Sequence, residues 1–528
     1  MANALFQLKD ERAGYLTGRL YTSLLPDSER KQKGAYYTPP TLAARLLESI
    51  ESTGFDWGTG TIVDPACGGA AFLAPLATKL AAHSKKRGPA RILADIESRL
   101  CGAEIDGFAA WISQVLLDVA LFDLAIAAGR PPEVSVMNID SLSGCEQFGR
   151  KFDLVVGNPP YGKITLAPAA RERYARSLFG HANLYGLFTD LAVDLANERG
   201  LIAYVTPTSF LGGEYFKNLR RLLADKAPLV RLDFVSDRDG VFHGVLQETL
   251  LAVFDKRTGS RGSVDVAVLH PETSDTEIEA ERLGCITNLR PDGGPWLLPR
   301  TKSQTSLLKR LSDMPHRLTD YGYAVSTGQL VWNRHKSQLR AELEPDLLPI
   351  VWAESVAADG TFEFQAARRN HLPYLKLNPR QQHLINHEPC ILVQRTTAKE
   401  QRRRLISAVI PNSFVLEHPG YVVENHLNMV YRSNPRTAAG LGAIAALLNS
   451  HVLDQAFRCI NGSVAVSAYE LNALPLPDPV QLAELQCAVD SGSDHGEVDR
   501  LITSFYLPAN GHTSPSRHRP RRHRKLAA

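Results

Sequence analysis

The sequence has no long hydrophobic run and no apolar segment at its start. Its first 20 residues carry five charged side chains, so we expect no secretory signal. The most apolar stretch, residues 115–128, is interrupted by Asp118 and Asp123 and is too short to cross a bilayer. These absences predict a cytoplasmic protein with no membrane partner.

Metal and triphosphate motifs are also missing. The seven cysteines form no Cys-x-x-Cys pair and no Cys/His spacing typical of zinc, which predicts a reduced compartment and no bound metal. No G-x-x-x-x-G-K-[ST] loop is present, so a P-loop that binds triphosphates is excluded.

Acidic residues are absent from the C-terminal tail. Residues 514–528 hold six Lys and Arg, and removing them from the net charge of +3 leaves the rest of the chain at −3. A nucleic-acid surface therefore has to be a local patch, helped by this tail. A solvated, disordered end is an equally good interpretation of residues 509–528.

The length of 528 residues predicts two or three domains. Between residues 60 and 255 short apolar runs alternate with longer amphipathic segments, which is typical of a doubly wound, mostly parallel α/β sheet. We expect strands at residues 61–63, 99–103, 134–137, 152–156, 201–205, 232–235 and 249–254. The last two are expected to form an antiparallel hairpin that closes the sheet edge. Ligands should bind outside the carboxyl ends of the strands.

The amino-acid composition changes after about residue 280, where Pro and Gly become frequent and aromatic residues mix with cations. We therefore expect a first domain at residues 1–279 and a second, mixed α/β domain at residues 280–508.

The most informative motif is Asn158-Pro159-Pro160-Tyr161, directly after an expected strand. The two prolines remove backbone donors and leave their carbonyls free for other partners. The Asn158 oxygen and the Pro159 carbonyl can accept both hydrogens of a planar amino group, and Tyr161 can cover its ring. The motif predicts a receptor for an exocyclic amine on a flat heterocycle.

Three acids follow three successive strands. Asp64 opens a turn of small residues and would repel a pyrophosphate, but it suits an ammonium group. Glu104 can accept two ribose hydroxyls, and Asp140 can accept an adenine amino group. The alternatives are tight packing for the turn and helix N-caps for the acids, with Asp106 as another cap. Together the acids outline a nucleoside-shaped pocket with an amino-acid end, which S-adenosylmethionine fits better than NAD.

These motifs occur in one order that resembles the motif series of the γ-class N6-adenine DNA methyltransferases, the TaqI type. The series is Gly34–Pro40, the Asp64 turn, Glu104–Asp106, Asp140, Asn158–Tyr161, Asn183–Phe188, Gly200–Pro207 and Val241–Phe242. The resemblance is dense over residues 34–255 and thinner through Val325–Gly328 and Ala468–Pro475. It implies a seven-stranded class I S-adenosylmethionine-dependent methyltransferase domain, followed by a domain that recognises the target in double-stranded DNA.

The resemblance implies a role for each motif residue. The residues implied for the cofactor are Thr38, Asp64, Ala66, Gly68, Glu104, Ile105 and Asp140. Thr38 and the backbone of the turn would contact the methionine end, and Glu104 would hold the ribose. Ile105 would pack on the cofactor's adenine, whose amino group Asp140 would bind.

For the target adenine, the implied residues are Asn158, Pro159, Pro160, Tyr161 and Phe242. Asn158 and the Pro159 carbonyl would grip the amino group, while Tyr161 stacks on the ring and Phe242 covers its other face. Accepting both hydrogens favours a pyramidal nitrogen, so positioning replaces a strong base or a metal. The paired base must first swing out of the duplex.

The turn departs from the family pattern at one point. The family often has Cys-Gly-Ser-Gly, and here Gly69-Ala70 stands in place of Ser-Gly. We expect a negative φ at Ala70, since a side chain is disfavoured at positive φ.

Two basic clusters in the second domain are candidates for reading DNA, and a plain solvated charge is the alternative for each member. The first consists of Trp332, Arg334, His335 and Lys336. The second consists of Gln394–Lys399 and Arg402–Arg404. Arg and Gln can bind guanine and adenine edges with two hydrogen bonds.

The favoured function is a sequence-specific DNA N6-adenine methyltransferase, acting as a monomer beside a separate restriction endonuclease. About 33 residues precede Gly34, which we expect to be too few for a fused nuclease. The alternatives are an N4-cytosine DNA methyltransferase, a protein-glutamine methyltransferase, and a non-catalytic DNA-binding assembly subunit.

Overall fold

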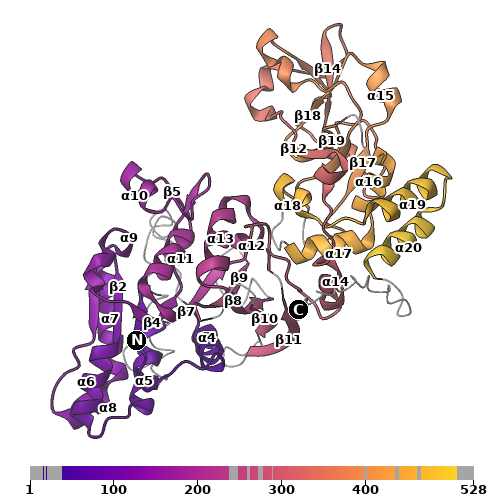
Figure 1. The fold of residues 1–528 in the computed structure, drawn as a ribbon. Helices are drawn as coiled ribbons and strands as arrows, with labels where there is room; N and C mark the ends of the chain where they lie inside the picture. Colours follow the sequence, from indigo (N-terminus) through magenta and orange to yellow (C-terminus); the bar gives the residue numbers. More distant parts are fainter. Residues whose placement is uncertain are drawn as a thin grey trace, which may run out of the picture.

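Figure 1 shows the computed structural model of the chain as two neighbouring units. It describes residues 38–236, 248–257, 262–271, 278–287, 289–397, 401–434, 439–460 and 465–507, together with Leu16 and Leu20. The basic tail expected at residues 509–528 lies outside these residues.

The first unit is built on a nine-stranded sheet with the strand order β11-β10-β8-β9-β7-β4-β1-β2-β3. The strands are β1 (Ile62–Asp64), β2 (Leu100–Glu104), β3 (Ser135–Asn138), β4 (Phe152–Gly157), β7 (Ala196–Pro207), β8 (Leu229–Val235), β9 (Thr249–Asp255), β10 (Val264–Pro271) and β11 (Ile278–Ile286). All neighbours pair in parallel except β9 with β7 and β8, and β11 with β10. A short ribbon of β5 (Lys163–Ile164) and β6 (Ala182–Asn183) lies apart from this sheet.

All seven expected strands are confirmed, but the expected size of the sheet is wrong. β10 pairs with β8 from Asp265↔Arg231 to Leu269↔Val235, and β11 then pairs with β10. The β8–β9 hairpin therefore lies inside the sheet and does not close its edge. The physical reason is that β8 has a second side on which its backbone groups need partners, and β10 supplies them. The expected boundary at residue 279 falls inside β11.

Helices cover both faces of this sheet, as its alternating side chains require. They are α4 (Pro40–Ser52), α5 (Leu73–His83), α6 (Pro89–Arg99), α7 (Gly107–Ala120), α8 (Phe122–Ala128), α9 (Ser141–Gly144), α10 (Pro168–Arg173), α11 (Leu184–Leu195), α12 (Ser209–Gly212) and α13 (Lys217–Lys226). Val155 of β4 packs into one core with α11 and α13. Val156, the next residue, packs into another core with α4 and α5.

No single helix of the described residues is long and apolar enough to cross a membrane, although α7 and α8, bent by 64° at their junction, meet the length and composition test together.

The second unit contains two four-stranded sheets and a group of helices. One sheet has the order β12 (Tyr323–Thr327), β19 (Leu427–Arg432), β16 (Ile391–Gln394) and β17 (Ser407–Val409). The other has the order β13 (Leu339–Arg340), β15 (Tyr374–Lys376), β14 (Leu347–Val351) and β18 (Val422–Val423). The helices are α14 (Gln304–Leu311), α15 (Asn412–Glu417), α16 (Leu441–Leu448), α17 (His451–Ile460), α18 (Ala468–Ala473), α19 (Pro479–Asp490) and α20 (His495–Tyr506).

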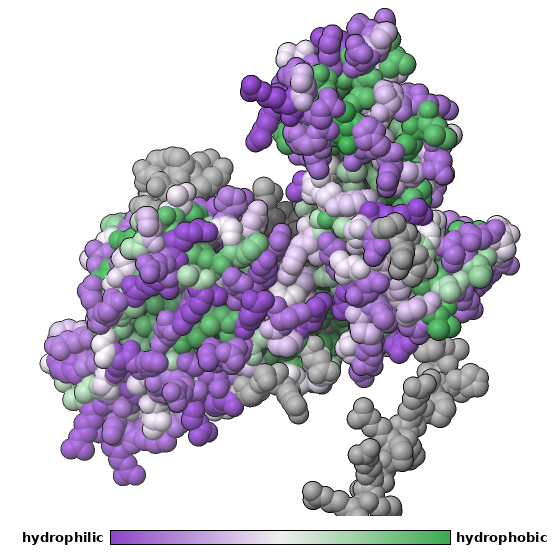
Figure 2. Space-filling view, turned by 45° about the horizontal axis from the view of Figure 1, so that its top comes forward, coloured by the Kyte–Doolittle hydropathy of each residue, from purple (hydrophilic) through white to green (hydrophobic). Residues whose placement is uncertain are grey.

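The two units are joined by a shared core. The largest hydrophobic cluster runs from Val155 and Phe210 in the first unit to Trp296, Phe457 and Tyr506. Above this junction the visible face in Figure 2 is hollowed between the first unit and the upper part of the second.

Candidate functional site

The Asn158–Tyr161 motif begins where β4 ends, at the carboxyl edge of the sheet. The Asn158 amide donates from Nδ2 to the Thr38 hydroxyl at 3.1 Å. Its Oδ1 accepts the Tyr161 hydroxyl at 2.7 Å. Since an amide oxygen has two lone pairs, Oδ1 can accept a second hydrogen. Thr38, just before α4, thus fixes which end of the amide faces outward.

Tyr161 is buried, with 8% of its surface exposed. Its ring meets Tyr185 edge-on at 6.1 Å, and its hydroxyl also lies 3.3 Å from the Val205 carbonyl. Burial raises the pKa of the Tyr161 hydroxyl well above its usual range, so it remains a donor. In this conformation the ring packs inside the molecule instead of presenting a face to a ligand.

Asp64, at the end of β1, is the most unusual acid of the site. It is 1% exposed, and its Oδ1 accepts the Ala66 N–H at 3.0 Å. The other oxygen, Oδ2, is buried and has no hydrogen-bond partner. Burial raises the pKa of Asp64 to about 8, with the Glu104 charge adding to the shift. A buried carboxylate with a free oxygen is a receptor for a cation such as an ammonium group.

The Asp64 side chain lies against the backbone of β4. A Cβ placed on Gly157 would come within 2.6 Å of Asp64 Oδ1. Only glycine allows this close approach, and it brings the carboxylate next to the residue that precedes Asn158. Asp64, expected to bind the cofactor, and Asn158, expected to bind the target amine, are therefore adjacent.

The turn after Asp64 is braced by neighbouring elements. The Gly68 N–H donates to Glu104 Oε2 at 3.0 Å, and the Ser113 hydroxyl of α7 donates to the Gly68 carbonyl at 2.5 Å. The Ser141 hydroxyl holds the Pro65 carbonyl at 2.6 Å. Sequence reasoning missed both serines, because they lie in distant helices and nothing in their own neighbourhood marks them.

The expectation of a negative φ at Ala70 is wrong. Its φ is +58°, close to the +54° of Gly68. The turn keeps the left-handed conformation that a glycine would adopt there, because Ala70 is 2% exposed and packed into the core with Phe72 and Leu73. Packing thus outweighs the local preference of alanine.

Glu104, Ile105 and Asp106 follow one another in the chain but have different environments. Glu104 Oε1 accepts the Asp106 N–H at 2.9 Å, and burial raises the pKa of Glu104. Asp106 is confirmed as the N-cap of α7, where it accepts from Phe108 and Ala109. Ile105 is 66% exposed, so its apolar side chain is available to cover a flat ring.

Asp140 is exposed and caps α9. Its Oδ1 accepts the Leu142 N–H at 3.0 Å, and its Oδ2 accepts the Ser143 hydroxyl at 2.8 Å. The cap alternative is therefore confirmed, and the remaining lone pairs leave room for one more donor. Phe242 lies outside the described residues.

The two basic clusters of the second unit differ. Trp332, Arg334, His335 and Lys336 share a short 3₁₀ region, in which Arg334 and Lys336 are exposed and Lys336 lies 5.4 Å from the Trp332 ring. This cluster presents charge to solvent.

Much of the second cluster is interior structure. Arg404 is 1% exposed and its Nε donates to Thr397, which is itself buried. Gln394 donates to the Val356 carbonyl at 2.7 Å. The expectation that these residues form an exposed surface is wrong for Arg404 and Thr397, because both are buried and their side chains hydrogen-bond to each other.

Comparison with known proteins gives a family match and several relatives. Residues 130–242, which include β4 and the Asn158 motif, match the model of the Eco57I restriction-modification methylase family. This chain is similar to the restriction-modification methylases. It is 26% identical over 368 residues to the type II methyltransferase M.PstI of Providencia stuartii, a span of 68% of this chain and 71% of that relative. It is 25% identical over 356 residues to M.BsuBI of Bacillus subtilis, spanning 66% and 70%. The expected cofactor, S-adenosylmethionine, is borne out at the level of these methyltransferase relatives.

Solved structures share the fold of the whole chain. The type IIL restriction-modification enzyme MmeI, determined in complex with DNA, superposes with a TM-score of 0.57 at 14% identity. The match covers 95% of this chain and 80% of that one, so the likeness in fold extends over both units. Among the described residues, no group of three or more His, Cys, Asp or Glu is placed to hold a metal ion.

Proposed function

We propose that this protein is a sequence-specific DNA methyltransferase that modifies the N6 amino group of adenine in duplex DNA. The observation that carries the proposal is the pairing of Asn158, oriented by Thr38, with the buried Asp64 carboxylate beside it. One of these groups accepts an amine to be methylated, and the other accepts the ammonium end of a methyl donor.

S-adenosylmethionine supplies the activated methyl group when it is bound. Asp64 would accept its ammonium group, Glu104 its ribose hydroxyls, and Ile105 would cover its adenine. Asp140, whose oxygens already cap α9, would accept the adenine amino group. These four residues lie along the carboxyl edge of β1, β2 and β3, where this fold binds nucleosides.

The target amine would sit between Asn158 and the Pro159 carbonyl. Asn158 Oδ1 and that carbonyl would accept its two hydrogens and orient its lone pair toward the cofactor side of the site. In this conformation Tyr161 donates to Asn158 Oδ1, and it would leave that oxygen to the target amine when the ring moves. We propose that this ring turns outward to stack on the flipped adenine, together with Phe242. The second unit would read the sequence, with the hollow in Figure 2 as the place for the duplex.

The relatives suggest a biological setting. M.PstI and M.BsuBI are type II methyltransferases, and we propose that this chain likewise protects host DNA from a separate restriction endonuclease. It would act as a monomer.

The first experiment tests the reaction. Purified protein, plasmid DNA and methyl-labelled S-adenosylmethionine should give labelled DNA, and nuclease digestion should release N6-methyladenosine. Release of N4-methylcytosine would move the assignment to the cytosine alternative. Label in protein would support the glutamine methyltransferase alternative. If neither DNA nor protein were labelled, the alternative of a non-catalytic DNA-binding subunit would be favoured.

Asn158→Ala should lower the rate of methyl transfer at least 10²-fold, the loss found when one preorganised hydrogen-bonding group is removed. Because Asn158 touches Thr38 but not Asp64 or Glu104 in the described contacts, cofactor affinity should change less than threefold in calorimetry. Equal losses in transfer and in cofactor binding would contradict the assigned role.

A further inference from the structure

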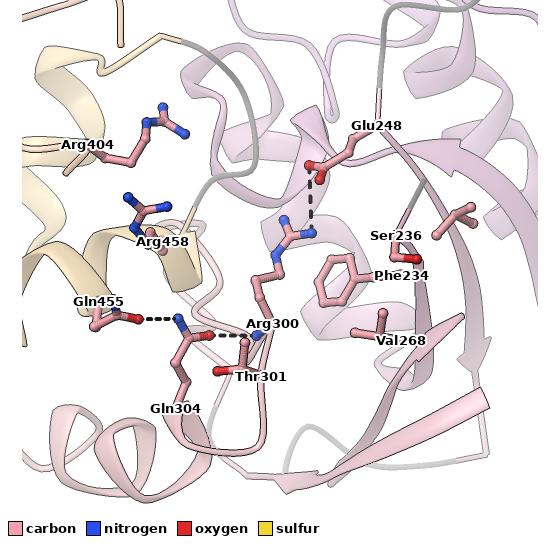
Figure 3. Close-up of a pocket in the computed structure, with 11 residues that line it drawn as sticks. Phe234, Ser236, Glu248, Val268, Arg300, Thr301, Gln304, Arg404, Gln455 and Arg458 are labelled. Carbon is pink, nitrogen blue, oxygen red and sulfur yellow. Dashed lines mark hydrogen bonds and ion pairs between the residues drawn. The ribbon is translucent and has the colours of Figure 1, made fainter. Parts of the chain in front are cut away.

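A cavity of about 400 Å³ lies away from the Asn158 site, where the carboxyl end of β8 faces α14 and α17 (Figure 3). Its volume is in the range of ligand pockets. Among the described residues that line it, the charged ones are Glu248, Arg300, Arg404 and Arg458. Within this described lining the cations outnumber the single carboxylate, which favours an anionic ligand over a cationic one.

Arg300 is the centre of the cavity. Its guanidinium lies 3.6 Å from the Phe234 ring centroid and 3.7 Å from the Glu248 carboxylate, beyond a good hydrogen bond. Its Nε and one terminal nitrogen, Nη2, are buried without a hydrogen-bond partner. Burial lowers the pKa of Arg300, so its charge is held in an unfavourable place. Buried donors of this kind cost free energy unless something in the cavity accepts them.

The opposite wall carries the other two arginines (Figure 3). Arg404 is buried and its Nε binds Thr397, while Arg458 of α17 binds Asp454 at 2.8 Å. Asp454 therefore offsets part of the charge of Arg458 but does not line the cavity.

The floor of the cavity is preorganised. Gln304 accepts the backbone N–H of Arg300 at 2.7 Å and donates to Gln455 at 2.9 Å (Figure 3). Arg300 and α17 are thus tied together through Gln304. Because Nε and Nη2 of Arg300 are buried in this conformation, its guanidinium has to turn toward the cavity to reach an anion.

The position of the cavity suggests where the anion comes from. β8 and β4 run in the same direction, with β7 and β9 between them, so the ends of β4 and β8 share one edge of the sheet. Three interstrand spacings of about 4.8 Å place them about 14 Å apart. A DNA strand whose base enters the Asn158 site can span that distance with its next few phosphates.

We propose that this cavity binds a backbone phosphate of the DNA strand near the adenine held by Asn158. This rests on the proposed function. The Arg300 fork donates to the phosphate oxygens with its two free N–H groups, Phe234 supports its plane, and Glu248 limits affinity by repulsion.

The test compares two substitutions of opposite sign. Arg300→Gln should weaken DNA binding about tenfold at low salt and reduce the slope of log K against log salt by about 0.9, the value for one lost phosphate contact. Glu248→Gln should tighten DNA binding severalfold, because the repelling charge is gone. The matched control is Arg282→Gln on β11, whose side chain is 69% exposed and paired with Asp265.

Each variant is assayed by fluorescence anisotropy with labelled duplex from 50 to 200 mM salt, and its fold is checked by thermal unfolding. If Arg300→Gln does not fold, Arg300→Lys keeps the charge but loses the fork and the Phe234 contact, and should weaken binding by a smaller factor. An unchanged salt slope for Arg300→Gln relative to Arg282→Gln, or weaker binding by Glu248→Gln, would overturn the proposal.

A second experiment distinguishes a phosphate of the DNA backbone from a free phosphate or nucleotide as the ligand of the cavity. Deoxyadenosine monophosphate and inorganic phosphate are titrated into wild-type and Arg300→Gln protein without DNA. If the substitution abolishes their binding but leaves the DNA salt slope unchanged, the ligand is a free phosphate and the DNA assignment is overturned. Methyl transfer by the wild type is measured separately, so failure of the proposed function and failure of the cavity are distinguishable.

Discussion

At the scale of single residues, Asp64 combines burial, an unpartnered oxygen and a contact with the β4 backbone. Its pKa of about 8 lies far above the ordinary 3.8 of an aspartate. Between these two values the unfolded chain has lost a proton that the folded protein keeps. The group therefore lowers stability as pH rises from about 4 to 8, and this penalty is absent below pH 4.

Asp64→Asn should remove this pH dependence. We expect the free energy of unfolding at pH 8 to rise by ~2–5 kcal/mol and to stay nearly unchanged at pH 4. Urea unfolding between pH 4 and 9 measures both. The same variant should lose affinity for S-adenosylmethionine, because an amide cannot ionise to balance an ammonium charge, whereas the Asp64 carboxyl can. If the free energy of unfolding varied with pH in the same way in Asp64→Asn and in the wild type, Asp64 would not be the group that titrates.

Ala70 makes a second prediction at this scale. A side chain at φ +58° costs about 1 kcal/mol relative to glycine, so Ala70→Gly should raise the free energy of unfolding by up to that amount. Ala71→Gly is the matched control: Ala71 is not among the residues with positive φ, and this substitution should destabilise. A loss of stability at both positions would mean that the Ala70 methyl contributes more through packing than its backbone costs.

At the scale of elements, α4 positions Thr38 against Asn158 and is itself tied to β8. Arg45 of α4 binds the buried Asp233 carboxylate at 2.8 Å, and Ser49 lies 3.4 Å from the same oxygen. Asp233 is 1% exposed, so its carboxylate needs these partners in place of water. The ion pair therefore connects the strand framework to the site through the helix that follows Thr38.

Arg45→Met should lower the free energy of unfolding by ~3 kcal/mol, because it leaves a buried carboxylate without its main partner. It should also weaken cofactor binding severalfold, since α4 and the backbone that carries Thr38 are then free to shift, whereas Asn158→Ala removes only one hydrogen bond to the Thr38 side chain. Glu48→Gln is the control, as Glu48 is 65% exposed and binds the same arginine. Calorimetric unfolding and cofactor titration of both variants test the link, and a stability loss of under 0.5 kcal/mol in Arg45→Met would refute it.

At the scale of the whole molecule, Arg220 joins the two units. It is fully buried and donates to the carbonyls of Phe210 at 2.6 Å and Gly294 at 3.0 Å. It also donates to the Tyr469 hydroxyl of α18 at 3.1 Å. Burial lowers the pKa of Arg220, so the guanidinium depends on these acceptors for its stability. Together with the continuous core, this cation predicts that the two units unfold together.

Arg220→Gln should reduce the free energy of unfolding by ~3–5 kcal/mol and split a single calorimetric transition into two. The neighbouring Arg221 is exposed, and Arg221→Gln should leave one transition with its midpoint nearly unchanged. One unshifted transition in Arg220→Gln would show that the hydrophobic core alone couples the units.

The sequence by itself determined the alternation of strands and helices, the order of the site motifs, and the Asp106 cap. These depend on local patterns, since apolar periodicity and capping act over a few residues. It did not reveal that β10 and β11 enlarge the sheet, because strand pairing joins residues far apart in the chain. Nor could it separate exposed Arg334 from buried Arg404.

Only the tertiary structure decided the chemistry of single groups. The raised pKa of Asp64 requires the exclusion of water by β4, and the free donors of Arg300 require a wall assembled from both units. The positive φ of Ala70 likewise follows from its place in the core. Burial and long-range contacts set these properties, and neither is a local function of residue type.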